Sequence, residues 1–203
     1  MQVCKFPFLV SFALFCLITG FCFAQDTISD RATGKSFPKT VAFDYEGSSY
    51  NLDATGVSTR KKFFAKVYSI AHYMEDPASV AGGDVFEAII NSKNAKQLTS
   101  IWVRNVSEKK VTDGYRESFG KILSREEMSE LNDQINQYLG FFGNVNSNDK
   151  HVIRWFPDGT VTVEINGEMK GSIKSEKFAR ALWNVWLGDR SVVKRDQLIS
   201  LIP

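Results

Sequence analysis

The chain has 203 residues, a formal net charge of +2, two histidines, and three cysteines that all lie within the first 22 residues. A charge this close to zero argues against nucleic-acid binding, which requires a basic surface. Beyond residue 22 there is no cysteine, so the rest of the chain offers neither a disulfide framework nor a thiolate metal site. Two histidines are also too few for a poly-histidine site, and we expect no metal and no cofactor.

Residues 1–24 have the pattern of a secretory signal peptide. Lys5 is their single charge, and an apolar stretch from Phe6 to Phe23 leads to Ala24, a small residue at the expected cleavage site. Cleavage after Ala24 removes 24 of the 203 residues and leaves 179, with a net charge of +1 and no cysteine. The alternative is an uncleaved membrane anchor, because an apolar run of 18 residues is near the lower limit for spanning a bilayer. We expect cleavage, a periplasmic or secreted protein, and no stable membrane span afterwards.

The first half of the mature chain predicts mainly strands. Residues 25–39 are polar and aperiodic, which predicts a flexible lead-in before a single domain at 40–203. Alternating apolar residues around a Gly-Ser-Ser break predict a hairpin over 40–51. Residues 60–74 carry apolar side chains at odd and even positions, which predicts one long central strand packed on both faces. The pattern then predicts a loop with a short helical turn at 77–83, an apolar element at 85–90 and a strand at 98–103.

The second half predicts helices and strands in alternating blocks. Ser107, Ser124 and Ser175 each stand where an N-cap is expected before an amphipathic stretch. They predict helices over 107–123, 124–142 and 175–188. Turn sequences predict three antiparallel strands over 151–156, 161–165 and 169–173, and a last helix is predicted over 193–201. This order indicates an α+β protein with helices on one face of a sheet.

Motifs of hydrolases, phosphate-binding loops, zinc proteases and dinucleotide sites are absent from the sequence. His72 lies within a predicted strand, where a structural histidine is expected more often than a general base. His151 opens a predicted hairpin and has no obvious partner. The residues alone therefore indicate an exported globular α+β domain and no specific chemistry.

The segment from Gly56 to Asp76 resembles the chalcone isomerase-like family, in which a Gly-rich turn and an Arg precede a strand with the pattern Phe-Phe-x-Lys-Val-Tyr. The resemblance continues at 96–107, 157–167 and 178–189, and spans about residues 40–202. The secreted bacterial branch is the most similar. The resemblance implies an open-faced β-sandwich of the chalcone isomerase type, with a largely antiparallel sheet and a layer of helices on one face.

The resemblance also implies a ligand-binding site. Arg60 matches an Arg that lines the ligand cleft of the family, although spacing alone would equally allow its side chain to point to solvent. Tyr115 matches a helix Tyr of the isomerases, and Tyr68 stands in place of a strand Thr. Ile122 and Val185 replace the Asn and the Thr that the isomerases need to orient a chalcone. These two replacements disfavour cyclisation and favour a long apolar ligand.

Three hypotheses follow from these residues. The first is a non-catalytic binder of a small amphipathic or fatty acid-like ligand, with Arg60 as anion anchor. The second is an intramolecular lyase of the chalcone isomerase type, in which Arg60 and Tyr115 are the catalytic candidates. The third is a structural or interaction protein without ligand, in which Arg60 is paired with a protein carboxylate and no cavity lies behind it.

Overall fold

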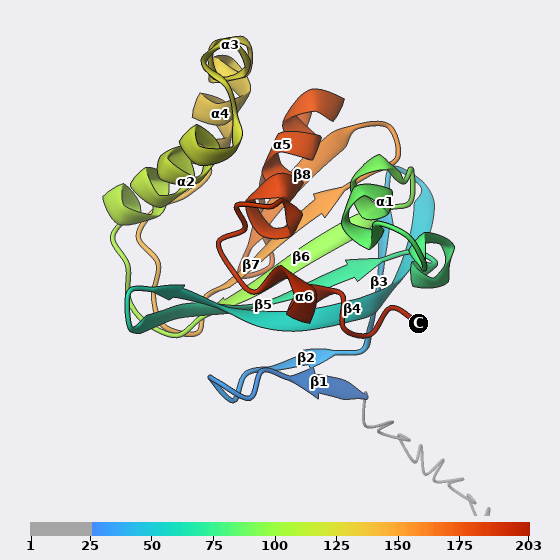
Figure 1. The fold of residues 1–203 in the computed structure, drawn as a ribbon. Coiled ribbons are helices and arrows are strands. Elements are labelled where there is room, and N and C mark those ends of the chain that lie inside the picture. Colours follow the sequence, from blue (N-terminus) through green and yellow to red (C-terminus); the bar gives the residue numbers. More distant parts are fainter. Residues whose placement is uncertain (1–25) are drawn as a thin grey trace, which may run out of the picture.

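The computed structural model describes residues 26–203, so the signal peptide predicted at 1–24 lies outside the described residues. A curved antiparallel sheet carries helices on one face, and a short N-terminal hairpin lies against the other (Figure 1). The α+β class predicted from the sequence is thereby confirmed, and so is the helix layer on one face of the sheet.

Seven strands form the main sheet, and each pairs antiparallel with the next in chain order. They are β3 (Thr40–Tyr45), β4 (Ser48–Lys62), β5 (Ala65–Met74), β6 (Lys96–Trp102), β7 (Lys150–Trp155), β8 (Thr160–Ile165) and β9 (Glu168–Lys174). The predicted hairpin over 40–51 is present as β3 and the start of β4. The three predicted strands of the second half are β7, β8 and β9.

The helices are α1 (Val85–Asn91), α2 (Glu108–Ile122), α3 (Arg125–Glu130), α4 (Asn132–Leu139), α5 (Glu176–Leu187) and α6 (Arg195–Leu198), with a 3-10 turn at Pro77–Val80. The single helix predicted over 124–142 is two short helices, which meet at Leu131. Ser124 and Glu127 form the predicted capping box, and the Ser175 hydroxyl accepts the expected bond from the Phe178 amide. Ser107 stands at the N-cap position without a side-chain capping bond.

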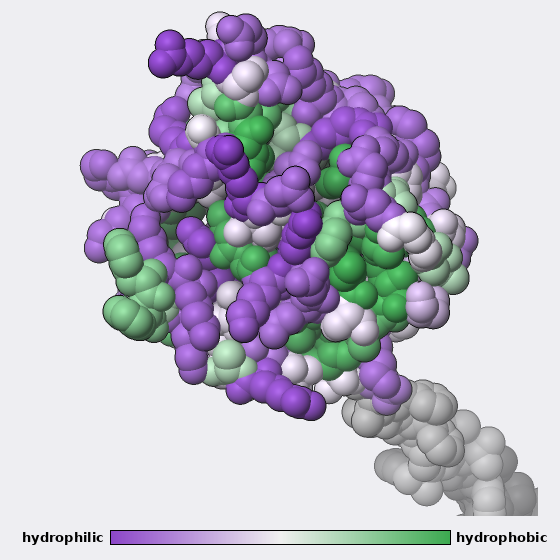
Figure 2. All heavy atoms as spheres, viewed as in Figure 1, coloured by the Kyte–Doolittle hydropathy of each residue, from purple (hydrophilic) through white to green (hydrophobic). Residues whose placement is uncertain are grey.

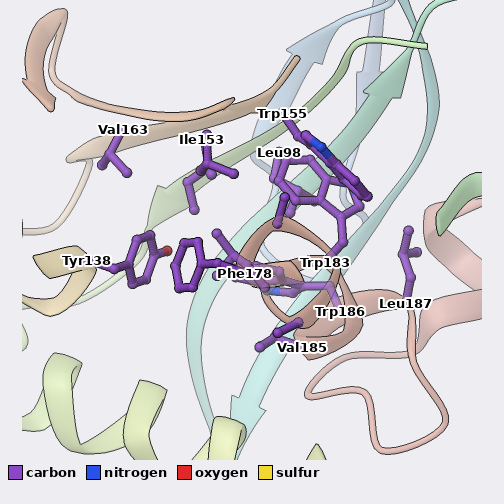
Figure 3. Packing of buried hydrophobic residues seen from close by; sticks show 14 of the residues in the cluster. Leu98, Tyr138, Ile153, Trp155, Val163, Phe178, Trp183, Val185, Trp186 and Leu187 are labelled. Carbon is purple, nitrogen blue, oxygen red and sulfur yellow. The ribbon is translucent and has the colours of Figure 1, made fainter. Parts of the chain in front are cut away.

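The main core lies between the sheet and the helices. Helix α5 supplies its centre, where Trp183 is fully buried and its ring centroid lies 5.4 Å from that of Trp155 on β7 (Figure 3). Phe178, also on α5, faces Tyr138 of α4 at a centroid distance of 5.5 Å. These aromatic contacts fix the helix layer above the strands that line the candidate site.

Residues 26–39 differ from the prediction of a flexible lead-in over 25–39. They contain strands β1 (Thr27–Ser29) and β2 (Ser36–Pro38), which pair with each other and place Phe37 in a small core on the far face of the sheet. The Asp30 carboxylate accepts hydrogen bonds from the hydroxyls of Ser69 and Thr59, at 2.6 and 2.5 Å. The hairpin is thus attached to the sheet by buried polar contacts, and the prediction was wrong for residues 27–38.

The single strand predicted over 60–74 is also wrong. The chain reverses at Phe63 and Phe64, so residues 60–62 end β4 and residues 65–74 form β5. Arg60 therefore belongs to a different strand from Tyr68 and lies directly opposite it in the β4–β5 register. The reversal therefore makes Arg60 and Tyr68 cross-strand neighbours, whereas a single strand would have held them apart.

Candidate functional site

A cavity of about 440 Å³ lies between the helix face of the sheet and helices α2 and α5. Its walls are mainly apolar and aromatic, with Tyr68 from β5, Trp102 from β6, Tyr115 from α2 and Val185 from α5. In Figure 2, green residues lie in a recess between the regions of α2 and α5 and are framed by purple ones. The size and lining are those of a site for a small organic ligand.

The β4–β5 register places Arg60 and Tyr68 side by side at this cavity, because cross-strand partners point to the same face of a sheet. The Tyr68 hydroxyl accepts a hydrogen bond from the Trp186 indole N–H at 3.0 Å, which leaves its own proton free for another acceptor. Burial raises the pKa of Tyr68, while the nearby charge of Arg60 acts in the opposite direction. Tyr68 is therefore a neutral hydrogen-bond donor at physiological pH.

Arg60 is half-buried and has a single hydrogen bond, from Nη1 to the carbonyl oxygen of Val192 at 2.8 Å. Within residues 26–203, no carboxylate lies within ion-pair distance of its guanidinium. A guanidinium has five N–H donors, so four remain for a ligand. The hypothesis of a purely structural role predicted an ion-paired Arg60 without a cavity behind it, and the structure has neither feature.

The mouth of the cavity carries an excess of positive charge. Lys62, Arg104 and Lys110 join Arg60 in its lining, and Asp113 is the acidic residue among them. Lys62 is paired with Glu117 at 3.2 Å, so the excess comes from Arg60, Arg104 and Lys110. Asp113 is already bound to Lys109, at 2.6 Å from carboxylate to ammonium. An apolar interior behind a cationic mouth is suited to a molecule with an anionic head and an apolar tail.

The other three predicted site residues, Tyr115, Ile122 and Val185, lie on helices α2 and α5. The Tyr115 ring stacks on Phe142 at a centroid distance of 5.1 Å, and burial raises the pKa of its hydroxyl, which stays protonated. Val185 is buried in the cavity wall. Ile122 lies two helical turns beyond Tyr115, roughly 10 Å along the axis, and borders a separate hollow next to Leu123. Four of the five predicted site residues therefore line one cavity, and Ile122 does not.

Sequence reasoning missed two features of this wall. Trp102 pairs with Tyr68 across β5 and β6, and its buried indole N–H has no hydrogen-bond partner among the described residues. Leu98, Ser100 and Trp102 occur at every second position of β6 and so share one face, and this spacing could have placed Trp102 in the wall of the site. Gly114 on α2 also lines the cavity and leaves open space where a side chain would stand.

Neither histidine is arranged for acid–base chemistry at neutral pH. His72 is fully buried, with Nδ1 2.7 Å from the Thr55 hydroxyl and Nε2 accepting from the Trp183 indole at 3.3 Å; burial lowers its pKa to about 3. His151 is buried, and neither of its ring nitrogens has a hydrogen-bond partner among residues 26–203; burial lowers its pKa to about 4. No group of three or more His, Cys, Asp or Glu side chains suited to a metal ion occurs in residues 26–203.

The sequence profile of the family described as chalcone isomerase-like matches residues 30–197. The chain belongs to the chalcone isomerase-like family. A crystal structure of a fatty-acid binding protein from Arabidopsis thaliana has a similar fold, with a TM-score of 0.70 and 16% sequence identity over 86% of this chain and 96% of that chain. Among curated proteins, none is significantly similar in sequence. In the described part of this family member, no helix has the length and apolar character needed to cross a membrane.

Proposed function

We propose that this family member is an exported, non-catalytic binder of an amphipathic acid, with a fatty acid as the ligand class. Arg60 would hold the carboxylate, Tyr68 would donate a further hydrogen bond, and the apolar walls around Val185 would take the chain. The observation that carries the proposal is the Arg60 guanidinium, which faces an apolar cavity of about 440 Å³ without a carboxylate partner in the described chain.

Leaving Arg60 without an anionic partner has a free-energy cost. A half-buried cation without a counter-ion loses hydration and recovers it only in part from one carbonyl oxygen. A carboxylate ligand would restore both charge neutrality and bidentate hydrogen bonding. The protein of similar fold from Arabidopsis thaliana is a fatty-acid binding protein, which supports this ligand class.

Export forms part of the proposal, because residues 1–24 carry a signal-peptide pattern. Expression with the natural N-terminus, followed by mass spectrometry of the periplasmic or secreted fraction, is expected to show a chain that begins at Gln25. A chain recovered with Met1 in the membrane fraction would contradict export and support the anchor alternative.

Native mass spectrometry of the purified protein tests the binding function. We expect co-purified species with the masses of fatty acids, displaced by added hexadecanoate, and 1:1 binding of hexadecanoate by calorimetry. Hexadecanol, which has the same chain but no charge, is expected to bind more weakly. A protein that is recovered empty and binds neither hexadecanoate nor shorter acids would overturn the proposal.

A further inference from the structure

The tip of the β4–β5 hairpin exposes two adjacent phenylalanines, Phe63 and Phe64, whose relative exposures are 90% and 102%. The other large apolar residues classed as exposed among the described ones, Met169 and Leu201, are each 51% exposed and lie elsewhere. In Figure 2 a pale green projection stands at the left edge, where Figure 1 draws the end of this hairpin. Packing within the described chain does not account for two fully exposed aromatic rings at one point.

The backbone at this tip makes the choice of residues more unusual. Phe63 has φ of 54°, in the left-handed region that bulky side chains rarely adopt and that Gly or Asn occupies easily. A turn selected for stability alone would therefore place a small or polar residue here. The backbone of Phe63 is held in a costly conformation and both rings are in contact with water, which points to a role in contact with something outside the chain.

The surroundings of the tip are basic. Lys61 and Lys66 flank it on the hairpin, and Arg104 borders the hollows beside both Phe63 and Phe64. No carboxylate lies within ion-pair distance of these three side chains inside residues 26–203. The nearby acidic group, Glu117, is already bound by Lys62 and Lys121, at 3.2 and 2.6 Å. The tip thus combines two exposed aromatic rings with three nearby cations that have no ion-pair partner among residues 26–203.

We propose that this tip docks on an anionic lipid bilayer, with Phe63 and Phe64 inserted among the acyl chains near the headgroups and the surrounding cations bound to lipid phosphates. Amphipathic elements with aromatic residues beside Lys and Arg bind membrane interfaces through this combination of forces. A convex point suits a fluid interface, which closes around it, whereas a protein partner would need a pocket shaped for two rings.

The position of the tip gives docking a use. Phe63 lines the mouth of the same cavity as Arg60, so a docked tip would bring that mouth to the bilayer surface. An amphipathic acid could then pass between membrane and cavity without crossing water. This use rests on the proposed function, whereas docking itself depends only on the tip.

A tryptophan placed at the tip tests docking in the full chain, because the four native tryptophans are buried. We expect the emission of Phe64→Trp to shift to shorter wavelength with vesicles of phosphatidylcholine and phosphatidylglycerol, and to be quenched by brominated acyl chains. Met169→Trp is the matched control on an exposed apolar site and is expected to show neither change. Vesicles of phosphatidylcholine alone, or 0.5 M salt, are expected to weaken the response of Phe64→Trp.

Co-sedimentation with the anionic vesicles gives the magnitude. Each partly buried ring contributes about tenfold to partitioning, so Phe63→Ser combined with Phe64→Ser is expected to lower it about 100-fold. Met169→Ser combined with Leu201→Ser serves as control. If vesicles of no composition change the emission of Phe64→Trp, the proposal is overturned. A protein partner or a second copy of the chain would then be left as the occupant of the tip. Hexadecanoate binding is measured in solution without vesicles. A protein that does not bind hexadecanoate is therefore distinguishable from one that does not dock on lipid.

Discussion

Replacing Arg60 by Gln removes the cation at the cavity mouth and keeps an uncharged polar side chain, which is two bonds shorter. Loss of one partner of a buried, hydrogen-bonded charge pair costs about 2–5 kcal/mol of binding. Arg60 is half-buried at an open mouth, so the lower part of this range applies, about 2–3 kcal/mol. At about 1.4 kcal/mol per tenfold change, the affinity for hexadecanoate is expected to fall roughly 30- to 150-fold.

Calorimetric titration at pH 8 measures this change with two internal controls. Hexadecanol has no charge, so wild type and Arg60→Gln are expected to bind it equally. Arg104 is an exposed cation in the same lining, and Arg104→Gln is expected to weaken hexadecanoate binding only about threefold and in a salt-dependent manner. Arg60→Gln also loses the hydrogen bond to Val192, so the free energy of unfolding of this variant, measured in urea, is expected to fall by about 1 kcal/mol.

Two results would refute the reasoning. If Arg60→Gln binds hexadecanoate as tightly as the wild type, Arg60 does not hold the carboxylate. If it loses hexadecanoate and hexadecanol to the same extent, the substitution has changed the shape of the cavity and has not removed an anion anchor. Only a loss confined to the acid supports the assignment.

Three further predictions test the cavity, the N-terminal hairpin and the buried histidine. Gly114→Leu puts a side chain into open space in the cavity and is expected to lower hexadecanoate affinity at least tenfold, whereas Gly120→Leu, on the same helix but outside the cavity, is expected to leave it unchanged; both should raise stability by up to about 1 kcal/mol, measured in urea. Asp30→Ala removes a carboxylate whose hydrogen bonds outweigh burial and lower its pKa, so the unfolding free energy is expected to fall by about 3 kcal/mol, and an unchanged urea midpoint would show that the hairpin contributes nothing. Burial lowers the pKa of His151 from 6.5 to about 4, so the unfolded chain takes up a proton in this window while the folded one does not, and stability is lost as pH falls from 6.5 to 4, by about 3 kcal/mol. Burial lowers the pKa of His72 to about 3, so His72 contributes to the same window, and His151→Phe is expected to remove only the His151 share of the slope in urea titrations. A curve identical to the wild type would contradict the assignment.

Most of the strands and helices followed from periodicity and capping residues, because buried faces impose regular spacing on the sequence. The turn at Phe63 and Phe64 did not, since neither residue is a turn former and the alternation of apolar positions continues across it. Its sequence is explained by contact outside the chain if the tip docks on lipid. Sequence rules for turns describe stability alone and cannot detect such a residue choice.

The N-terminal hairpin was missed for a different reason. Residues 26–39 are polar as a whole, but Ile28 and Phe37 face a small core and Gly34 has φ of 72°, as a tight turn requires. Two apolar residues are too few to show a period. Ile122 was assigned to the site by the family resemblance, as the residue in place of the isomerases' Asn, and only the packed structure shows that it borders a separate hollow.

The cavity is assembled from β4, β5, β6, α2, α5 and the loop at Val192, which together span most of the chain. The cavity exists only when all of these elements have folded together. A bound molecule would therefore stabilise the complete fold and would not stabilise a partly folded chain. At a concentration 100 times its dissociation constant, such a molecule adds about 2.7 kcal/mol to the free energy of unfolding. If the proposed acid binds, its supply would help to set how long the chain survives proteases wherever the chain resides.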